Sequence, residues 1–457
     1  MELQKENKMG HMPVNKLLLS MSLPIMVSML VQASYNVVDS VFVAMIDENA
    51  LTAVSLAFPI QSLMIAVAVG TGVGINAVLS KSLGEKKYDK VNMTAANGVF
   101  LAIISYLVFL VTGLTAVVPF YRSQTADAQI LQYGKIYLTI ICVSSLGIFV
   151  QITFERILQS TGKTIFTMLT QGTGAIINII LDPILIFGLL GMPKLGMAGS
   201  AVATVMGQTI AGILAVVINH KANQEVKIHF KGFRPNKDII KQIYLVGIPS
   251  IVMQAMGSLM TYGINLILIS FTATATAVFG VYFKLQSFVF MPIFGLNNGM
   301  VPIIAYNYGA GKKDRLIKTI KLSIVYAVLL MIVGFIIFQT CPHMLLLLFN
   351  ASETMLSIGK PALRIISIGF LVAGFSIICS SVFQALGNGI YSMIISLIRQ
   401  LIVLLPAAYL LSRLGNVNYV WWAFPIAEIV AIALSAFFLI RIYRKVIRHI
   451  GEIKEEI

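Results

Sequence analysis

The chain has 457 residues, of which 58% are hydrophobic and only 11% are charged, and its formal net charge is +15. A water-soluble protein of this length needs more charge to cover its surface, so the composition excludes a soluble globular protein and predicts a membrane protein. The net positive charge does not indicate a nucleic-acid partner, because the basic residues gather in loops that would all lie on one side of the membrane.

Apolar runs of about 20 residues, each long enough to cross about 30 Å of hydrocarbon, follow one another along the chain. In the first half they lie near residues 15–45, 51–80, 94–119, 133–159, 164–187 and 195–218. In the second half they lie near residues 240–271, 276–308, 318–341, 357–384, 390–412 and 418–441. Each run is expected to be a helix, because a helix satisfies its own backbone hydrogen bonds in lipid. The predicted fold is an all-α integral membrane protein with about twelve transmembrane helices.

The second half of the chain repeats the first at a constant offset of 225 residues, as the pairs Pro24/Pro249 and Met168/Met393 show. Such duplication in an apolar chain is typical of secondary transporters. Six spans per half return the chain to its starting side, so the two six-helix lobes are expected to be related by a pseudo-two-fold axis along the membrane normal. We predict an N-terminal lobe over 1–218, a cytoplasmic linker over 219–237 and a C-terminal lobe over 238–457.

Basic residues precede the first predicted span, surround the linker, and follow the second, eighth and last spans. Loops rich in lysine and arginine stay on the cytoplasmic side, so both termini are expected in the cytoplasm of a multi-pass protein of the cell membrane. The expected partners are the lipid bilayer and small-molecule substrates, and the expected oligomeric state is a monomer.

A carboxylate inside hydrocarbon is costly, so an acidic residue there is a functional candidate by default. Asp39 lies well inside the first predicted span, and helical spacing places Gln32, Tyr35 and Asn36 on the same stripe. In the same span Pro24 removes a backbone hydrogen bond and permits a bend, so Pro24 is the predicted hinge. The alternative for Asp39 is a neutral side chain buried in a packing network.

The fifth predicted span carries Asn178 and Asp182, which are four residues apart and therefore share a helix face. Comparison of the two halves supports a functional role for both aspartates, because Asp39 corresponds to Ile264 and Asp182 corresponds to Ala407. Two further polar residues behave in the same way, since the partners of Asn178 and Thr204 are Val403 and Ile429. A polar group found in one half only is expected of an ion site added to a duplicated scaffold.

These residues, in this order, resemble the multidrug and toxic compound extrusion (MATE) family. The resemblance is carried by Pro24 with Gln32, Tyr35, Asn36 and Asp39, by Gly70–Gly84, by Gln159–Lys163, by Asn178 with Asp182 and Pro183, by Gly196–Thr204, and by Gly295–Pro302 with Asn307–Lys312. It covers essentially the whole chain, and the nearest branch is that of the MepA-like bacterial multidrug exporters. The resemblance implies two lobes around a central cavity and export by alternating access.

The resemblance also implies that the chain exports lipophilic, mostly cationic drugs in exchange for H⁺ or Na⁺. The implied ion site consists of Asp39 and Asp182 with Asn178, Thr204, Tyr35 and Asn36, and the two aspartates would be the metal ligands if the ion is Na⁺. Some relatives also have acidic residues on the seventh and tenth helices, but the matching segments 249–269 and 365–384 contain none. No cofactor other than the coupling ion is expected.

A further set of residues is expected to line the substrate cavity: Gln32, Gln61, Met64, Glu155, Gln254, Met256, Gln286 and Met291. For the glutamines, hydrogen bonds between packed helices are an equal alternative. Glu155 is equally compatible with local pairing to the neighbouring Arg156. Lys284, Arg399 and Glu428 are expected to form structural ion pairs.

The main alternative function is a flippase or exporter of a lipid-linked or other endogenous metabolite. A carrier of a lipid-linked pyrophosphate would need several cations in its cavity, and Lys284 and Arg399 are the only deep candidates. An enzyme is not expected, because none of the five histidines lies deep in a predicted span.

Overall fold

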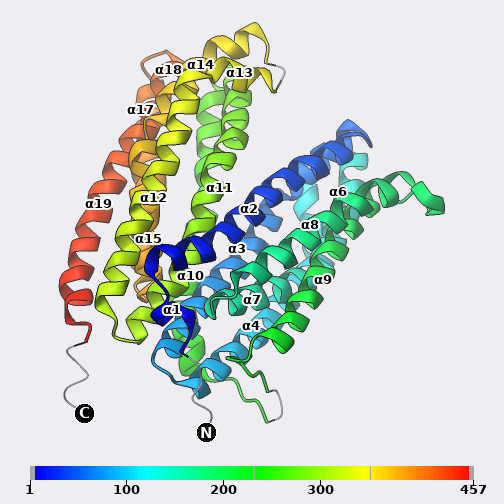
Figure 1. Ribbon diagram of the computed structural model, residues 1–457. Coiled ribbons are helices and arrows are strands. Elements are labelled where there is room, and N and C mark those ends of the chain that lie inside the picture. The colour runs from blue at the N-terminus through cyan, green and yellow to red at the C-terminus, as the bar shows by residue number, and fades with distance from the viewer. Residues whose placement is uncertain (1–5, 230–231, 350, 452–457) are drawn as a thin grey trace. The chain divides into compact units, whose positions relative to one another are not determined.

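The computed structural model describes residues 6–229, 232–349 and 351–451, and every regular element within these ranges is a helix (Figure 1). The chain divides into two compact units. The N-terminal unit is Val27–Gly247, and the C-terminal unit combines Met1–Met26 with Ile248–Ile457. These boundaries differ from the predicted limits at residues 218 and 237, because the first helix of each half begins in the other half's unit.

The N-terminal unit contains most of α2 (Val14–Ala44) and the start of α10 (Lys237–Ile269). Between them lie α3 (Glu48–Gly84), α4 (Tyr88–Thr115), α5 (Val117–Gln124), α6 (Ala128–Val143), α7 (Leu146–Ser160), α8 (Thr164–Phe187), η1 (Leu189–Gly191) and α9 (Met197–Ala222). Its core is apolar and includes Phe109, Phe149 and Tyr121.

The C-terminal unit contains α1 (Lys8–His11), the start of α2 and most of α10. The remaining elements are α11 (Ala273–Gly309), α12 (Lys313–Thr340), α13 (Pro342–Leu347), α14 (Glu353–Ser367), α15 (Phe370–Ala385), α16 (Gly389–Leu397), the π-helix η2 (Ile398–Leu404), α17 (Leu405–Ser412), α18 (Val417–Val420), α19 (Ala423–Lys445) and η3 (Ile447–His449).

Ten helices of the described chain are long and apolar enough to cross a membrane, and two bent pairs raise this number to twelve. The bent pairs are α6 with α7, at 44°, and α14 with α15, at 51°. The sequence predicted one continuous helix at each of these places. The structure shows breaks at residues 144–145 and 368–369, where backbone N–H groups bond to carbonyls three residues earlier, as in Ser145 to Cys142 and Gly369 to Ile366. This tighter turn redirects the helix, and it occurs within one residue of the same point in both repeats.

The shared helices α2 and α10 pack through a repeated pair of glycines. In the C-terminal unit, Cβ atoms added at Gly295 and Gly299 would lie 2.6 Å from Met26 and 2.4 Å from Ser22 of α2. In the N-terminal unit, a Cβ added at Gly74 would lie 2.1 Å from the carbonyl oxygen of Ile243 of α10. The repeat equates Gly74 with Gly299. The second helix of each repeat therefore uses a side-chain-free surface to receive the first helix of the other repeat.

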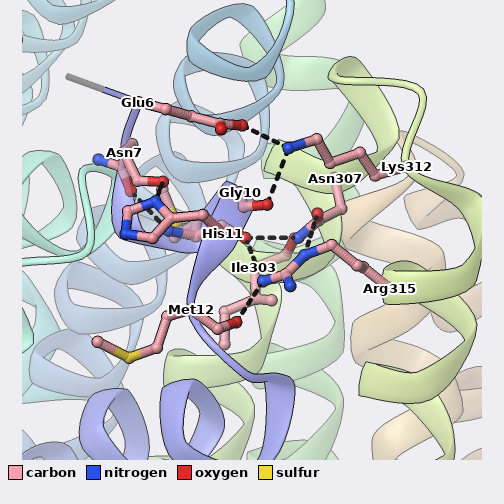
Figure 2. A network of polar contacts seen from close by, with 10 residues as sticks. Glu6, Asn7, Gly10, His11, Met12, Ile303, Asn307, Lys312 and Arg315 are labelled. Atoms are coloured by element: carbon pink, nitrogen blue, oxygen red, sulfur yellow. Dashed lines mark hydrogen bonds and ion pairs between the residues drawn. The ribbon is translucent and has the colours of Figure 1, made fainter.

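The N-terminal segment is held in the C-terminal unit by the turn between α11 and α12 (Figure 2). Arg315 donates from Nη2 to the carbonyl oxygens of Met9 and Met12, at 3.0 and 2.7 Å. Lys312 pairs with Glu6 and donates to the carbonyl oxygen of Gly10 at 2.8 Å. These contacts fix the segment that leads into α2.

Candidate functional site

The candidate site of the N-terminal unit is built on two carboxyl groups, Asp39 of α2 and Asp182 of α8. The two groups adjoin each other, and the hydroxyl of Ser200 on α9 lies beside Asp39. Asp182 is fully buried. The Oδ1 atoms of Asp39 and Asp182 are both buried without a hydrogen-bond partner. Two carboxylates with unused oxygens in low dielectric favour a shared proton or a bound cation.

Asn178 and Thr204 complete the polar surroundings of Asp182. Asn178 Nδ2 and Thr204 Oγ1 are 3.3 Å apart. When the Asn178 amide is turned by 180°, its nitrogen donates to Asp182 Oδ2 at 3.3 Å and its oxygen accepts from Thr204 N at 3.1 Å. This close approach of α8 and α9 depends on glycine, because a Cβ added at Gly207 would lie 2.7 Å from the carbonyl oxygen of Gly174.

Two tyrosines flank the carboxyl pair. Tyr35 lies within electrostatic reach of Asp39 and Asp182, and Tyr137 of α6 lies within reach of Asp39. Gln61 of α3 donates from Nε2 to the Tyr137 hydroxyl at 3.1 Å. Gln61 thus makes the helix-to-helix hydrogen bond that the sequence left open as an alternative to cavity lining.

The rest of the predicted stripe on α2, Gln32 and Asn36, is exposed. Ser200 and Tyr137 were missed by the sequence analysis. Their repeat partners are Pro425 and Ala362, so the comparison of halves that selected Asp39 would also have selected them.

Glu155 of α7 forms a second polar cluster in the N-terminal unit. Its Oε1 accepts from Gln151 Nε2 at 3.0 Å and from Thr170 Oγ1 at 2.9 Å, and its Oε2 accepts from Gln171 Nε2 at 2.8 Å. Glu155 is only 3% exposed, and the neighbouring Arg156 donates to Gln159 at 2.9 Å. Neutral donors therefore hold the Glu155 carboxyl group in place.

The other residues predicted to line the substrate cavity differ in how far their side chains are buried. Met64 is 2% exposed and packs in the apolar core of the N-terminal unit. This packing explains the methionine without a substrate cavity. In the C-terminal unit Gln254 is exposed, whereas Met256, Gln286 and Met291 are partly exposed on α10 and α11.

The three charged residues singled out in the second half separate into a pair and a single cation. Arg399 Nη1 lies 3.1 Å from Glu428 Oε1, as the expectation of ion pairing required. Lys284 lies instead over the ring of Phe349, 5.9 Å from its centroid. Among the described residues, no group of three or more His, Cys, Asp or Glu side chains is arranged to hold a metal ion.

A protein-family model described as MatE matches the chain twice, over residues 24–184 and 249–410. The matches begin at Pro24 and Pro249, the same pair that begins the internal repeat. The chain is similar to the multidrug export protein MepA of Staphylococcus haemolyticus, at 28% identity over 92% of both chains. It is also similar to MepA of Staphylococcus aureus strain MRSA252, at 26% identity over 94% of both chains.

Solved structures show the same fold. A multidrug resistance MATE family transporter of the MOP superfamily, in its outward-facing conformation, superposes with a TM-score of 0.91 at 24% identity, over 97% of this chain and 99% of the other. A MATE protein in a bent conformation superposes with a TM-score of 0.89 at 24% identity, over 96% of this chain and 98% of the other. The predicted all-α, multi-span fold class is confirmed.

Proposed function

This chain belongs to the MATE family, and on that premise we propose that it exports lipophilic, mostly cationic drugs from the cytoplasm by ion-coupled antiport. As a family member with ten to twelve apolar spans among its described residues, it is a multi-pass membrane transporter for small molecules and not an enzyme. We place it in the cell membrane with both termini in the cytoplasm, because the basic loops require that orientation. The names of the relatives, multidrug export proteins, support the substrate class.

The observation that carries the proposal is the adjoining pair Asp39 and Asp182, each with one buried oxygen that has no partner. Two neighbouring carboxylates repel each other unless a proton or a cation lies between them. The hydroxyl of Ser200 lies beside Asp39, and carboxylate and hydroxyl oxygens are hard ligands that suit Na⁺ as well as a shared proton. The coupling ion is therefore H⁺ or Na⁺.

In this proposal, helix α2 couples ion binding to drug transport. This helix passes from the C-terminal unit to the N-terminal unit at Met26–Val27, two residues after Pro24. The helix is continuous through Pro24, which lacks the backbone N–H of a regular turn. Ion binding at Asp39 would change how the second part of α2 packs. The helix would then bend at Pro24, where a backbone hydrogen bond is missing.

The test is efflux of ethidium, a fluorescent lipophilic cation, from proteoliposomes with a pH gradient and a Na⁺ gradient imposed separately. We expect one gradient to drive uphill transport and the other to have no effect. Ethidium movement that responds to neither gradient would contradict ion coupling, and failure to move any of several lipophilic cations would contradict the substrate class.

No observation favours the flippase alternative. Of the two deep cations that could hold a pyrophosphate, Arg399 is engaged by Glu428. We propose that the transporter acts as a monomer, since each half of the duplicated fold supplies one lobe.

A further inference from the structure

The pair Arg399 and Glu428 has a geometry that a purely structural ion pair does not need. Arg399 Nη1 bonds to Oε1 of Glu428 alone, and Oε2 of Glu428 is buried without a partner. The side chains of Arg399 and Glu428 are 25% and 18% exposed, so the pair lies at the edge of the packed interior. A structural pair gains most when the guanidinium binds both oxygens, and this one leaves half of the carboxylate unused.

The backbone that carries Arg399 is irregular. Residues Ile398–Leu404 form a π-helix, and Pro406 follows it in the first turn of α17. Proline has no backbone N–H, so a regular helical hydrogen bond is lost at this point. Single π-turns within helices are rare and are frequently found at functional sites. The irregular turn thus places the one charged residue of this segment at its start.

Aromatic residues lie in the electrostatic neighbourhood of the Glu428 carboxylate. Phe424 is one turn earlier on the same face of α19, and its ring centroid is 6.1 Å from that of Tyr282. Tyr282 is within electrostatic reach of both Glu428 and Arg399. At Gly369, a Cβ would lie 3.1 Å from Cγ of Glu428, so the glycine makes room for the acidic side chain beside Phe370. A carboxylate against aromatic rings is a chemical environment that attracts lipophilic cations.

The repeat shows that this helix pair is used for charge in both halves. Arg399 and Glu428 correspond to Gly174 and Ala203, which lie on α8 and α9. Those two helices carry Asp182 and Thr204 of the candidate ion site. At this place the N-terminal half has two adjoining carboxyl groups, Asp39 and Asp182, whose repulsion a proton or cation would relieve. At the matching place the C-terminal half has the carboxylate of Glu428 and the cation of Arg399.

We propose that Glu428 binds the positive charge of lipophilic organic cations, and that Arg399 occupies Glu428 when no such ligand is bound. The ligand and the guanidinium carry the same charge, so exchanging one for the other keeps the carboxylate balanced. Arg399 has a long flexible side chain with part of its surface exposed, which lets the displaced guanidinium turn to water. This inference rests on the proposed function and names a substrate-binding residue for it.

The test measures binding of radiolabelled tetraphenylphosphonium to purified full-length protein, with neutral triphenylphosphine oxide as a second ligand. We expect Glu428→Gln to weaken tetraphenylphosphonium binding about tenfold, because the carboxylate is lost. We expect Arg399→Gln to strengthen it by about the same factor, because the competing cation is lost. Neither variant should change the affinity for the neutral ligand.

Control variants separate this role from a structural one. Lys284→Gln removes a cation from α11 of the same unit and should leave tetraphenylphosphonium affinity unchanged. Arg399→Lys keeps the charge and should resemble the wild type. If Arg399→Gln fails to fold, the double variant Arg399→Gln/Glu428→Gln carries no unpaired charge and should match Glu428→Gln.

Two results would overturn the proposal. The first is unchanged tetraphenylphosphonium affinity in Glu428→Gln while the wild type still binds and exports the cation, which leaves the proposed function intact. The second is an equal loss of both ligands, which would show that the ion pair only supports the fold. A wild type that binds no lipophilic cation would instead contradict the substrate class and this inference together.

Discussion

The two halves of the chain have the same sequence of helices but treat buried charge in opposite ways. On α8 and α9 the N-terminal half places Asp182 against Asp39 of α2, with an unpaired oxygen on each carboxyl group. On η2 and α19 the C-terminal half pairs Glu428 with Arg399 at 3.1 Å. Duplication preserved the packing, while the polar residues diverged. We propose that the carboxyl pair, which has no basic side chain of its own, is what makes the N-terminal half respond to an ion gradient.

The largest expected effect comes from variants that remove a carboxyl group of the pair Asp39 and Asp182, which tests the difference in buried charge between the two halves. Asp39→Asn and Asp182→Asn should each reduce gradient-driven efflux to background, because one remaining carboxylate no longer needs a shared proton or cation. The double variant should lose little more than either single variant, since the two groups act as one site. The measurements are gradient-driven ethidium efflux from proteoliposomes and ethidium-induced ion release from purified protein. Partial losses that simply add would show that the two residues work independently.

A second prediction concerns a feature that the halves share. Gly74→Ala places a Cβ about 2.1 Å from a backbone carbonyl oxygen of α10, which forces the two helices apart. We expect a loss of about 2 kcal/mol or more in stability, comparable to overpacking a well-packed core. The measurement is the thermal unfolding midpoint of the protein in detergent.

The matched control for that change is Gly172→Ala on α8, where nothing lies within 4 Å of the added Cβ. It should leave the midpoint unchanged or raise it slightly, because alanine favours a helix. The repeat predicts that Gly299→Ala, next to Ser22 of α2, behaves like Gly74→Ala. A large effect at only one of Gly74 and Gly299 would break the equivalence of the two contacts.

A third prediction addresses the second polar cluster, which only the N-terminal half has, since Glu155 corresponds to Ser380. Glu155→Leu removes the acceptor of the Gln151 and Gln171 amides, while Thr170 still donates to the carbonyl oxygen of Thr167, and an unsatisfied buried donor costs about 1–3 kcal/mol. We expect a lower unfolding midpoint for this variant. Glu155→Gln keeps an acceptor oxygen and should lose much less. Equal losses in the two variants would assign a charge-dependent role to Glu155.

The sequence predicted the number and order of the spans, because apolar length is a property of local composition and the internal repeat can be read from the sequence itself. It also selected Asp39, Asp182, Asn178 and Thr204, because each of these polar residues has an apolar residue at the matching position of the second half. It did not predict the bends at residues 144–145 and 368–369, since these depend on single backbone hydrogen bonds within an apolar run. Nor did it predict the burial of Met64, because a methionine on a helix does not reveal which face packs.

The smallest expected effect concerns the turn between the second and third helices of each repeat. In the C-terminal unit Lys312 pairs with Glu6 of the N-terminal segment, whereas its repeat partner Lys87 pairs with the nearby Glu85 at 2.9 Å. The Lys312 and Glu6 side chains are 35% and 41% exposed, so Glu6→Gln should cost less than about 1 kcal/mol, and the loss should disappear at high salt.

Arg315→Ala should cost more than Glu6→Gln, because it removes the Arg315 donor of the Met12 carbonyl oxygen and leaves Met9 with Asn307 alone. Both variants are compared with Lys87→Gln by thermal unfolding at low and high salt. The N-terminal segment leads directly into α2, whose later part carries Asp39, so loosening it should also slow efflux without changing which ion drives it. If Glu6→Gln destabilises the protein as strongly as Arg315→Ala, the ion pair rather than the backbone contacts holds the segment.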